Sequence, residues 1–508
     1  MGLQKSKTVK KEIGYTKIDT NIGDLGPTIC QIAAYEDIKL ERGSYVKLGK
    51  SNKQYYVGQV IDGPYFVEGS GTRYEITYTV DLNAEIRDGI QRAVLDRPIP
   101  HTPIFPLEES LVQEFLGTTG SLTLGKLLTQ EMVKIQLDSA TLARHMGIFG
   151  TTGTGKSNTI QTMMEEGSKS GFAVLTFDIE GEYVLMDEPT ERLVELLGKF
   201  DYRPEGINDF DIYVPYPCLS RRKDAIKFGV SFEESDLMLF SEIAGLSKIE
   251  RLFFFDLIER VKAVAPAFRK ITLEAVLERL NSRLSAQADN PSMPPYIAEA
   301  HTSLYGKLMA IKNLDMVDVE AKMMKVEDVL IPGKVSVIDF SDATNQLKNI
   351  AVANILEKIF TYKMTHIDSP RILIVLEEAH GLVSKDQREE MMGTIAFLLE
   401  IARRGRKRGI CLGIVTQQPA FLPSELLELC NIRIMHRLSS TTNIGCLKES
   451  TGNVPDAMWR LLPSMGVGQA IIASPRYTRS VIAQVRPVAS KRIEQQFLFE
   501  PLKNDKGD

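Results

Sequence analysis

The spacing of hydrophobic residues divides the chain into segments of different character. Between about residues 12 and 100, short runs of aromatic and β-branched residues alternate with turn residues, as in "GSYVKL", "QYYVGQVI" and "RYEITYTVDL". Several short strands in close succession predict a small β-barrel or sandwich. The basic residues 1–11 before it are predicted to be a disordered start. The four prolines of "DRPIPHTPIFP" predict a linker, which we place over 101–134.

A different pattern begins near residue 135. The continuous apolar runs "MGIFG" and "GFAVLTFD" enclose a helical stretch, which predicts a parallel βαβ unit. Four later runs, "KVSVIDF", "RILIVLEEAH", "GICLGIVTQQP" and "IRIMHRL", predict further strands, and "GQAIIASPRYTRSVIAQV" predicts a hairpin. We therefore predict an α/β core in two parts, 135–218 and 331–490, followed by a C-terminal tail over 491–508.

Helical periodicity separates the two parts of this core. The sequence "SFEE" at Ser231 has the form of a capping box, with Glu234 three residues later. Further on, one helical face of "ITLEAVLERLNSRL" collects the apolar residues Leu273, Val276, Leu277, Leu280 and Leu284. We predict an inserted helical subdomain over 219–330.

Composition and charge narrow the class of protein. The 508 residues carry a formal net charge of -5, which argues against a surface that is basic throughout but allows a local basic channel. The five cysteines show no CxxC spacing, so a metal knuckle is not expected, and reduced thiols fit a cytoplasmic protein. No apolar run approaches the roughly 18 residues of a membrane span, so no membrane contact is expected.

The stretch "GIFGTTGTGKSNTI" is the first segment that predicts a ligand as well as a fold. It satisfies the pattern GxxxxGK[ST] between an apolar strand and a helix, which is the context that a phosphate-binding loop requires. Glycines let successive backbone N–H groups curl around phosphates, Lys156 reaches the β- and γ-phosphates, and Ser157 binds Mg²⁺. We predict ATP and Mg²⁺ as ligands. The predicted nucleotide-binding residues are Gly150, Thr151, Thr152, Gly153, Thr154, Gly155, Lys156, Ser157, Asn158 and Arg144.

An acidic pair ends the strand "RILIVLEEAH". An ATPase needs one acid for the Mg²⁺ shell and a second that orients the attacking water. We assign Glu377 to the first role and Glu378 to the second. A polar residue at the tip of the adjacent strand can contact the γ-phosphate, and Gln417 is the candidate, with Thr416 as the alternative.

The basic run "IARRGRKRGI" has three interpretations. It could supply an arginine to the nucleotide of a neighbouring subunit, contact DNA, or form a solvated face. Arg403 and Arg406 are three residues apart and could share a helix face. Arg144 precedes the phosphate-loop strand and is a candidate contact at a subunit boundary, whereas His145 and His380 are predicted to be structural.

Together these motifs resemble the HerA-type ATPases of the HerA/FtsK superfamily. The resemblance rests on "GTTGTGKSN", "TFDIEGEY", "VLEEAH", "IARRGRKRG" and "VTQQP" in this order, and extends over about residues 12–490. It implies a RecA-like P-loop core, a small N-terminal barrel, and a homo-hexameric ring that moves along double-stranded DNA in its central pore. The usual partner in archaea is the nuclease NurA in DNA end resection. Bacterial relatives work with nucleases or sirtuin-like effectors in anti-phage defence.

The resemblance also implies roles for individual residues. It makes Lys156 and Ser157 nucleotide ligands, Gln417 the sensor, and either Arg403 or Arg406 the arginine that acts on the neighbouring subunit. Asp178, at the tip of the next strand, is placed near the metal-bound water. The sequence "RRGR" departs from the pattern of relatives that carry an acid at its second position, so the choice between the two arginines stays open.

Three functions compete at this point. The first is a DNA translocase, with Lys385 and Arg388 as candidates for the pore. The second is an ATPase ring that assembles or gates an effector nuclease without processive movement. The third, a GTP switch, is disfavoured because "DIEG" at Asp178 is not followed by an NKxD sequence. The sequence contains no second acidic cluster of the kind a nuclease needs, so we expect no DNA cleavage by the chain alone.

Overall fold

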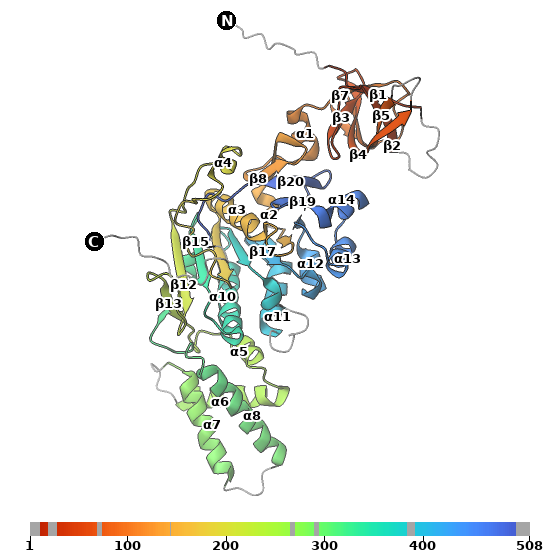
Figure 1. Ribbon diagram of the computed structural model, residues 1–508. Helices are drawn as coiled ribbons and strands as arrows, with labels where there is room; N and C mark the ends of the chain where they lie inside the picture. The colour runs from red at the N-terminus through yellow and green to blue at the C-terminus, as the bar shows by residue number, and fades with distance from the viewer. Residues whose placement is uncertain are drawn as a thin grey trace, which may run out of the picture.

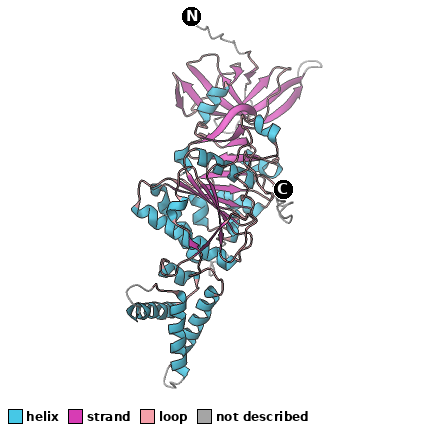
Figure 2. Ribbon diagram, turned by 90° about the vertical axis from the view of Figure 1, so that its left-hand side faces the viewer, coloured by secondary structure: helices cyan, strands magenta, loops and turns pink. Residues whose placement is uncertain are grey.

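The computed structural model describes residues 11–18, 28–68, 74–142, 144–264, 270–288, 294–383 and 392–493. Three regions follow one another along the long axis of the molecule (Figure 1): a barrel, a large sheet flanked by helices, and a helical arm. Figure 2 shows that strands dominate the barrel end, whereas the far end of the arm is helical. No helix in the described ranges combines the length and apolarity that crossing a membrane would need.

The N-terminal region is a closed barrel, as predicted. In the part of this region that the structure describes, six strands pair in the order β2-β1-β7-β3-β4-β5, and β5 pairs with β2 to close the ring, while β6 adds to β5 at the edge. Closure satisfies the backbone hydrogen bonds that an open edge would leave exposed. The strands are β1 (Gly14–Thr16), β2 (Ile29–Ala34), β3 (Tyr45–Leu48), β4 (Gln54–Glu68), β5 (Tyr74–Arg87), β6 (Ile90–Arg92) and β7 (Pro103–Pro106).

The predicted linker over 101–134 was wrong. Its first part is β7, which lies between β1 and β3 and buries Ile104 completely. Two of the four prolines are the first and last residues of this strand, where a missing N–H disturbs the ladder least. The remainder forms α1 (Glu109–Leu116), β8 (Leu122–Leu127) and the start of β9 (Gln130–Leu137), which belong to the edge of the central sheet.

Within the described residues, the central sheet has 13 strands in the order β14-β13-β12-β15-β11-β16-β17-β10-β18-β19-β20-β8-β9. Strands from β14 to β18 are parallel, and the pairs from β18 onward are antiparallel. The predicted hairpin is confirmed as β19 and β20. The strands not yet bounded are β10 (Met146–Phe149), β11 (Ala173–Asp178), β12 (Phe210–Pro215), β13 (Ile226–Gly229), β14 (Lys322–Met323), β15 (Val335–Asp339), β16 (Ile372–Leu376), β17 (Ile410–Thr416), β18 (Ile432–Met435), β19 (Gln469–Ala473) and β20 (Val481–Val485).

Helices cover both faces of the parallel part. Successive residues of β16 face opposite sides, so Leu373 packs with α3 (Lys156–Lys169) and Ile374 packs with α10 (Asn345–Thr365) and α11 (Met392–Arg404). Burial on both sides explains why these strands read as continuous apolar runs. The shorter helices are α2 (Ser139–Leu142), α4 (Val194–Gly198), α9 (Val326–Val329), α12 (Ser424–Leu429), α13 (Thr441–Ser450) and α14 (Asp456–Leu461), with 3₁₀ turns η1 (Ala379–Gly381), η2 (Gly405–Arg408), η3 (Pro419–Phe421) and η4 (Leu462–Ser464).

The helical arm is confirmed but is shorter than the predicted 219–330. It comprises α5 (Leu237–Ile243), α6 (Lys248–Val264), α7 (Leu273–Ala288) and α8 (Pro295–Lys312), while β13 and β14 on either side extend the parallel sheet. The predicted capping box at Ser231 opens no helix, because α5 begins after Asp236. The reciprocal pair instead opens α6, where Ser247 N donates to Glu250 Oε2 at 2.6 Å and Glu250 N to Ser247 Oγ at 3.3 Å.

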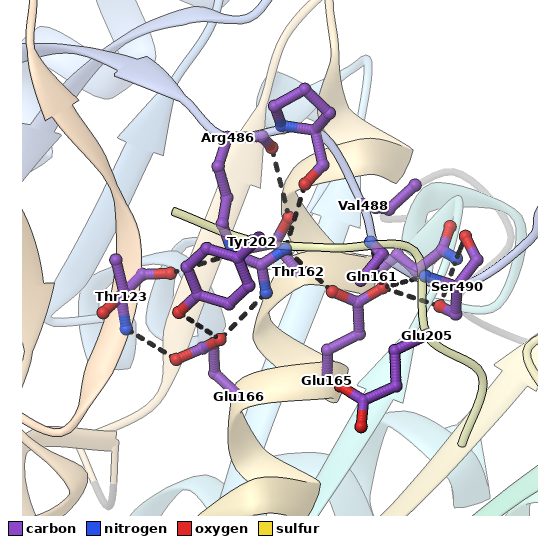
Figure 3. A network of polar contacts seen from close by, with 12 residues as sticks. Thr123, Gln161, Thr162, Glu165, Glu166, Tyr202, Glu205, Arg486, Val488 and Ser490 are labelled. Carbon is purple, nitrogen blue, oxygen red and sulfur yellow. Dashed lines mark hydrogen bonds and ion pairs between the residues drawn. The ribbon is translucent and has the colours of Figure 1, made fainter. Parts of the chain in front are cut away.

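A C-terminal segment, residues 486–493, crosses α3 and fixes its position; we call it the strap. Arg486, whose side chain is fully buried, pairs with Glu165 at 2.8 Å and with Glu166 at 2.9 Å, both on α3 (Figure 3). Glu165 Oε1 also accepts hydrogen bonds from the strap at Ala489 N and from Ser490 N and Oγ. The helix that carries Lys156 is therefore held by charge and hydrogen bonds from residues more than 300 positions later.

Candidate ATPase site

The loop between β10 and α3 has the geometry of a phosphate cradle. Gly153 and Gly155 have φ values of 73° and 115°, which residues other than glycine rarely adopt. A Cβ at Gly150 would lie 2.7 Å from the Cβ of His436, so this position requires glycine for space. Two backbone hydrogen bonds hold the loop to the segments after β18 and before β19: Thr151 N donates to Arg437 O at 2.9 Å, and Gly468 N donates to Thr154 O at 2.9 Å.

Lys156 is held inside this loop. Its side chain is buried and its Nζ donates to Thr151 O at 3.2 Å. Burial lowers the pKa of Lys156, and the nearby carboxylates of Glu378 and Glu377 oppose that shift. A cation at this point, above the N-terminus of a 14-residue helix, suits a phosphate chain.

The two acids after β16 lie beside the loop, as the sequence indicated. Glu377 is buried; its Oε1 accepts a hydrogen bond from Tyr183 at 2.6 Å, and its Oε2 has no partner among the described residues. Glu378 has φ 41° and ψ 49°, a left-handed conformation that is strained for a glutamate. This backbone turn directs two successive side chains to different places.

Gln417 connects the loop to the acidic pair. Its Oε1 accepts a hydrogen bond from Thr152 Oγ1 at 2.6 Å, and its Nε2 donates to Glu378 Oε1 at 2.7 Å. On the other side, His380 Nδ1 lies 3.3 Å from Glu378 Oε2 and 3.1 Å from Thr416 Oγ1. Burial opposes ionisation, but the His380 ring and the Gln417 amide outweigh it and lower the pKa of Glu378. A charged carboxylate held by two polar partners can orient a water molecule.

Asp178 does not take the position near the metal that was predicted for it. Both oxygens of Asp178 accept backbone N–H groups of residues 181–183 at 2.8–3.1 Å, so Asp178 fixes a turn instead of facing the metal position. Glu182, at the end of that turn, is buried, and burial raises its pKa, while Arg492, the Ser157 hydroxyl and Lys156 oppose that shift. The sequence offers three acids in the five residues 178–182, and the geometry of the turn decides which of them is left free of backbone hydrogen bonds.

Asn158 also differs from its prediction. Its Nδ2 donates to Arg486 O at 2.8 Å and its Oδ1 accepts from Val488 N at 3.2 Å, so the side chain anchors the strap and does not face nucleotide. His436, which the sequence gave no reason to select, supports α3 from the other side: Thr159 Oγ1 lies 2.8 Å from its Nε2, and its Nδ1 lies 2.9 Å from Gln469 O.

The candidate arginines lie at the amino ends of the parallel strands, opposite to the ends that carry the phosphate loop and Gln417. Arg403 and Arg406 precede β17, and Gln417 follows it; seven residues of strand separate the two ends by about 20 Å. Arg144 is at the same edge as these arginines, since its neighbour His145 hydrogen-bonds Ala402 O at 2.9 Å. None of the three can therefore serve the phosphate loop of its own chain. The pore candidates Lys385 and Arg388 lie outside the described residues.

Arg403 and Arg406 differ in what surrounds them. Arg403 forms an ion pair with Glu425, with a distance of 2.6 Å between Nη2 and Oε2. The exposed guanidinium of Arg406 makes no hydrogen bond or ion pair with any residue that the structure describes. Arg406 is therefore the one of the two that is free to contact another molecule.

The residues around Ser157 fit a magnesium ion. A hydroxyl and nearby carboxylates are the oxygen ligands that Mg²⁺ takes, commonly together with water and substrate phosphates. Burial, followed by the charges of Glu182 and Asp178, raises the pKa of Glu377 well above its usual range, a cost that a cation beside it would relieve. The unpartnered Oε2 of Glu377 is available for that contact.

Comparison with known proteins agrees with this geometry. Residues 122–359 match the family described as "Helicase HerA, central domain". A probable helicase of Methanocaldococcus jannaschii is 24% identical over 485 residues, covering 92% of this chain and 85% of the relative. The DNA double-strand break repair helicase HerA of Saccharolobus solfataricus is 25% identical over 382 residues, covering 74% and 70%.

A solved structure shares the fold. The plasmid coupling protein TrwB, in complex with ADP and Mg²⁺, superposes with a TM-score of 0.51 at 12% identity, covering 78% of this chain and 95% of the other. At this identity the likeness concerns the arrangement of the P-loop core. The family match, the relatives and the loop with its acidic pair lead to one assignment: residues 122–359 form the central domain of a HerA-type P-loop ATPase.

Proposed function

We propose that this chain is an ATP-driven double-stranded DNA translocase that works as a hexameric ring with a nuclease or another effector, in DNA end processing or anti-phage defence. The observation that carries the proposal is the hydrogen-bonded connection from Thr152 through Gln417 to Glu378. It couples the loop that would bind the γ-phosphate to the acid beside it and to the end of β17. The curated relatives named as DNA double-strand break repair helicases support DNA as the substrate.

The residues divide the work of hydrolysis. The loop N–H groups and Lys156 hold the phosphates, while Ser157 and Glu377 would hold Mg²⁺, which neutralises charge on the phosphates when bound. Glu378 orients the attacking water. Gln417 exchanges its contact with Thr152 for one with the γ-phosphate. Loss of the γ-phosphate therefore changes the contacts at the end of β17.

The position of the arginines supports the proposed ring. Arg406 lies at the amino end of β17, away from the phosphate loop of its own chain, and it is unpaired among the described residues. It therefore suits the nucleotide of a neighbouring subunit. There it would stabilise charge that builds up on the γ-phosphate, the contribution of an arginine supplied in trans. Hydrolysis in one subunit then depends on the position of the next.

The test is steady-state ATP hydrolysis with linear duplex DNA of increasing length, using wild type and Lys156→Ala. Stimulation that grows with DNA length and is absent in the variant is the expected result. Turnover that is indifferent to DNA would refute translocation and favour the ring that only assembles or gates its effector.

A second variant isolates the water-orienting acid. Glu378→Gln keeps a side chain of the same length and is expected to bind ATP while turnover falls by a factor of about 100 or more. Turnover above a tenth of wild type would assign the water to another residue.

A further inference from the structure

The turn that follows β11 is fixed by its own first residue. Asp178 is fully buried and accepts three backbone N–H groups, from Gly181 at 2.8 Å, Glu182 at 3.1 Å and Tyr183 at 2.8 Å. Gly181 has φ 70°, which closes the turn tightly. The positions of the next two side chains are thereby set by the strand and not by a mobile loop.

These two side chains lie near the two predicted metal ligands. Glu182 is buried, and the Ser157 hydroxyl on α3 is among the groups that oppose the rise of its pKa caused by burial. Tyr183, which is fully buried, donates its hydroxyl proton to Glu377 Oε1 at 2.6 Å. The turn after β11 therefore supplies a direct hydrogen bond to the predicted metal ligand that follows β16.

The Tyr183 hydrogen bond determines how Glu377 presents its carboxylate. With Oε1 engaged, Oε2 is the atom left for the metal, and it is buried without a partner among the described residues. Without the hydroxyl, the carboxylate could turn about its last bond and lose that orientation. Partners of metal-binding carboxylates act in this way, and their removal typically weakens metal binding 10–100-fold.

We propose that Tyr183 is a positioning residue for the metal site, holding Glu377 so that Oε2 faces the ion. The inference rests on the proposed function, because it assumes that Mg²⁺ binds with nucleotide between Ser157 and Glu377. Asp178 acts one step further away, by fixing the turn that carries Tyr183.

The experiment compares Tyr183→Phe with Tyr213→Phe. Tyr213 is a matched control: it is equally buried, and its hydroxyl donates to the carboxylate of Asp211 at 3.2 Å, but it lies on β12, two strands away from β11 in the sheet. Binding of a fluorescent ADP analogue is measured first in EDTA and then against increasing MgCl₂. The readout is the Mg²⁺ concentration at half-saturation, together with the melting temperature of each variant.

In Tyr183→Phe the half-saturating Mg²⁺ concentration should rise at least 10-fold, with affinity in EDTA unchanged, whereas Tyr213→Phe should match wild type. An unchanged Mg²⁺ requirement, or an equal loss of affinity with and without Mg²⁺, would overturn the inference and leave Tyr183 a core residue. Failure of the wild-type protein to bind nucleotide would instead refute the proposed function.

Discussion

Replacing Arg486 by methionine should measure how strongly the strap holds the phosphate-loop helix. The guanidinium is fully buried and contacts two carboxylates, Glu165 at 2.8 Å and Glu166 at 2.9 Å, and it stacks 4.2 Å from the ring of Tyr202. Methionine keeps most of the volume but leaves two buried carboxylates without their cation. Breaking a buried ion pair by removal of one partner costs about 3–5 kcal/mol.

The structure favours the lower end of this range. Glu165 keeps its hydrogen bonds from Ala489 and Ser490, and Glu166 keeps those from Thr123 and Tyr202. We therefore expect a loss of about 3 kcal/mol in the free energy of unfolding of the core. Adding Glu165→Gln and Glu166→Gln removes the unpaired charges and should restore part of this loss.

The assay is urea unfolding followed by tryptophan fluorescence. The chain has a single tryptophan, Trp459, which is buried in the core, so its signal reports the core and not the barrel or the arm. A loss below about 1 kcal/mol for Arg486→Met, or no difference between this variant and the triple variant, would refute the reasoning that charge carries the contact.

Three further predictions concern pH, capping and the ring. His145 donates from Nε2 to Ala402 O at 2.9 Å and accepts at Nδ1 from Leu412 N at 3.0 Å, and burial lowers its pKa to about 4. Because the histidine of the unfolded chain is protonated near pH 6.5, the free energy of unfolding in urea should fall as the pH drops from 6.5 towards 4. The fall should be smaller in His145→Gln. Burial opposes ionisation of Glu250, but hydrogen bonds from Lys307 and other donors lower its pKa to about 2. Its stabilisation of α6 is therefore present above pH 4.5 and is lost progressively as the pH falls from 4.5 towards 2, and Glu250→Gln should speed hydrogen exchange in α6 at pH 7. Mixing Arg406→Ala with Lys156→Ala chains, each inactive alone, should restore ATP turnover if the arginine acts across subunits, and no recovery would contradict that assignment.

Much of the core could be predicted because its signals are local. Glycines, Lys156 and Ser157 follow one another in a loop whose geometry depends on neighbours in sequence, and the buried parallel strands read as apolar runs. The choice between Asp178 and Glu182 could not be made in this way, because it depends on which acid the backbone of the turn captures. The role of Asn158 depends on the strap, which arrives from 328 residues later. The strand β7 could not be predicted, because its prolines argue against a strand and its pairing partners β1 and β3 are brought beside it only in the closed barrel.

The left-handed backbone at Glu378 sets the demands of chemistry against those of stability. A glycine there would relieve a strain of about 1 kcal/mol or more, and an asparagine would tolerate the same dihedral angles better than glutamate does. Selection for a high free energy of unfolding alone would therefore replace glutamate at this position. Glu378→Gly could accordingly make the core harder to unfold while it abolishes turnover, so that a screen for thermostable variants without an activity check would favour a dead enzyme.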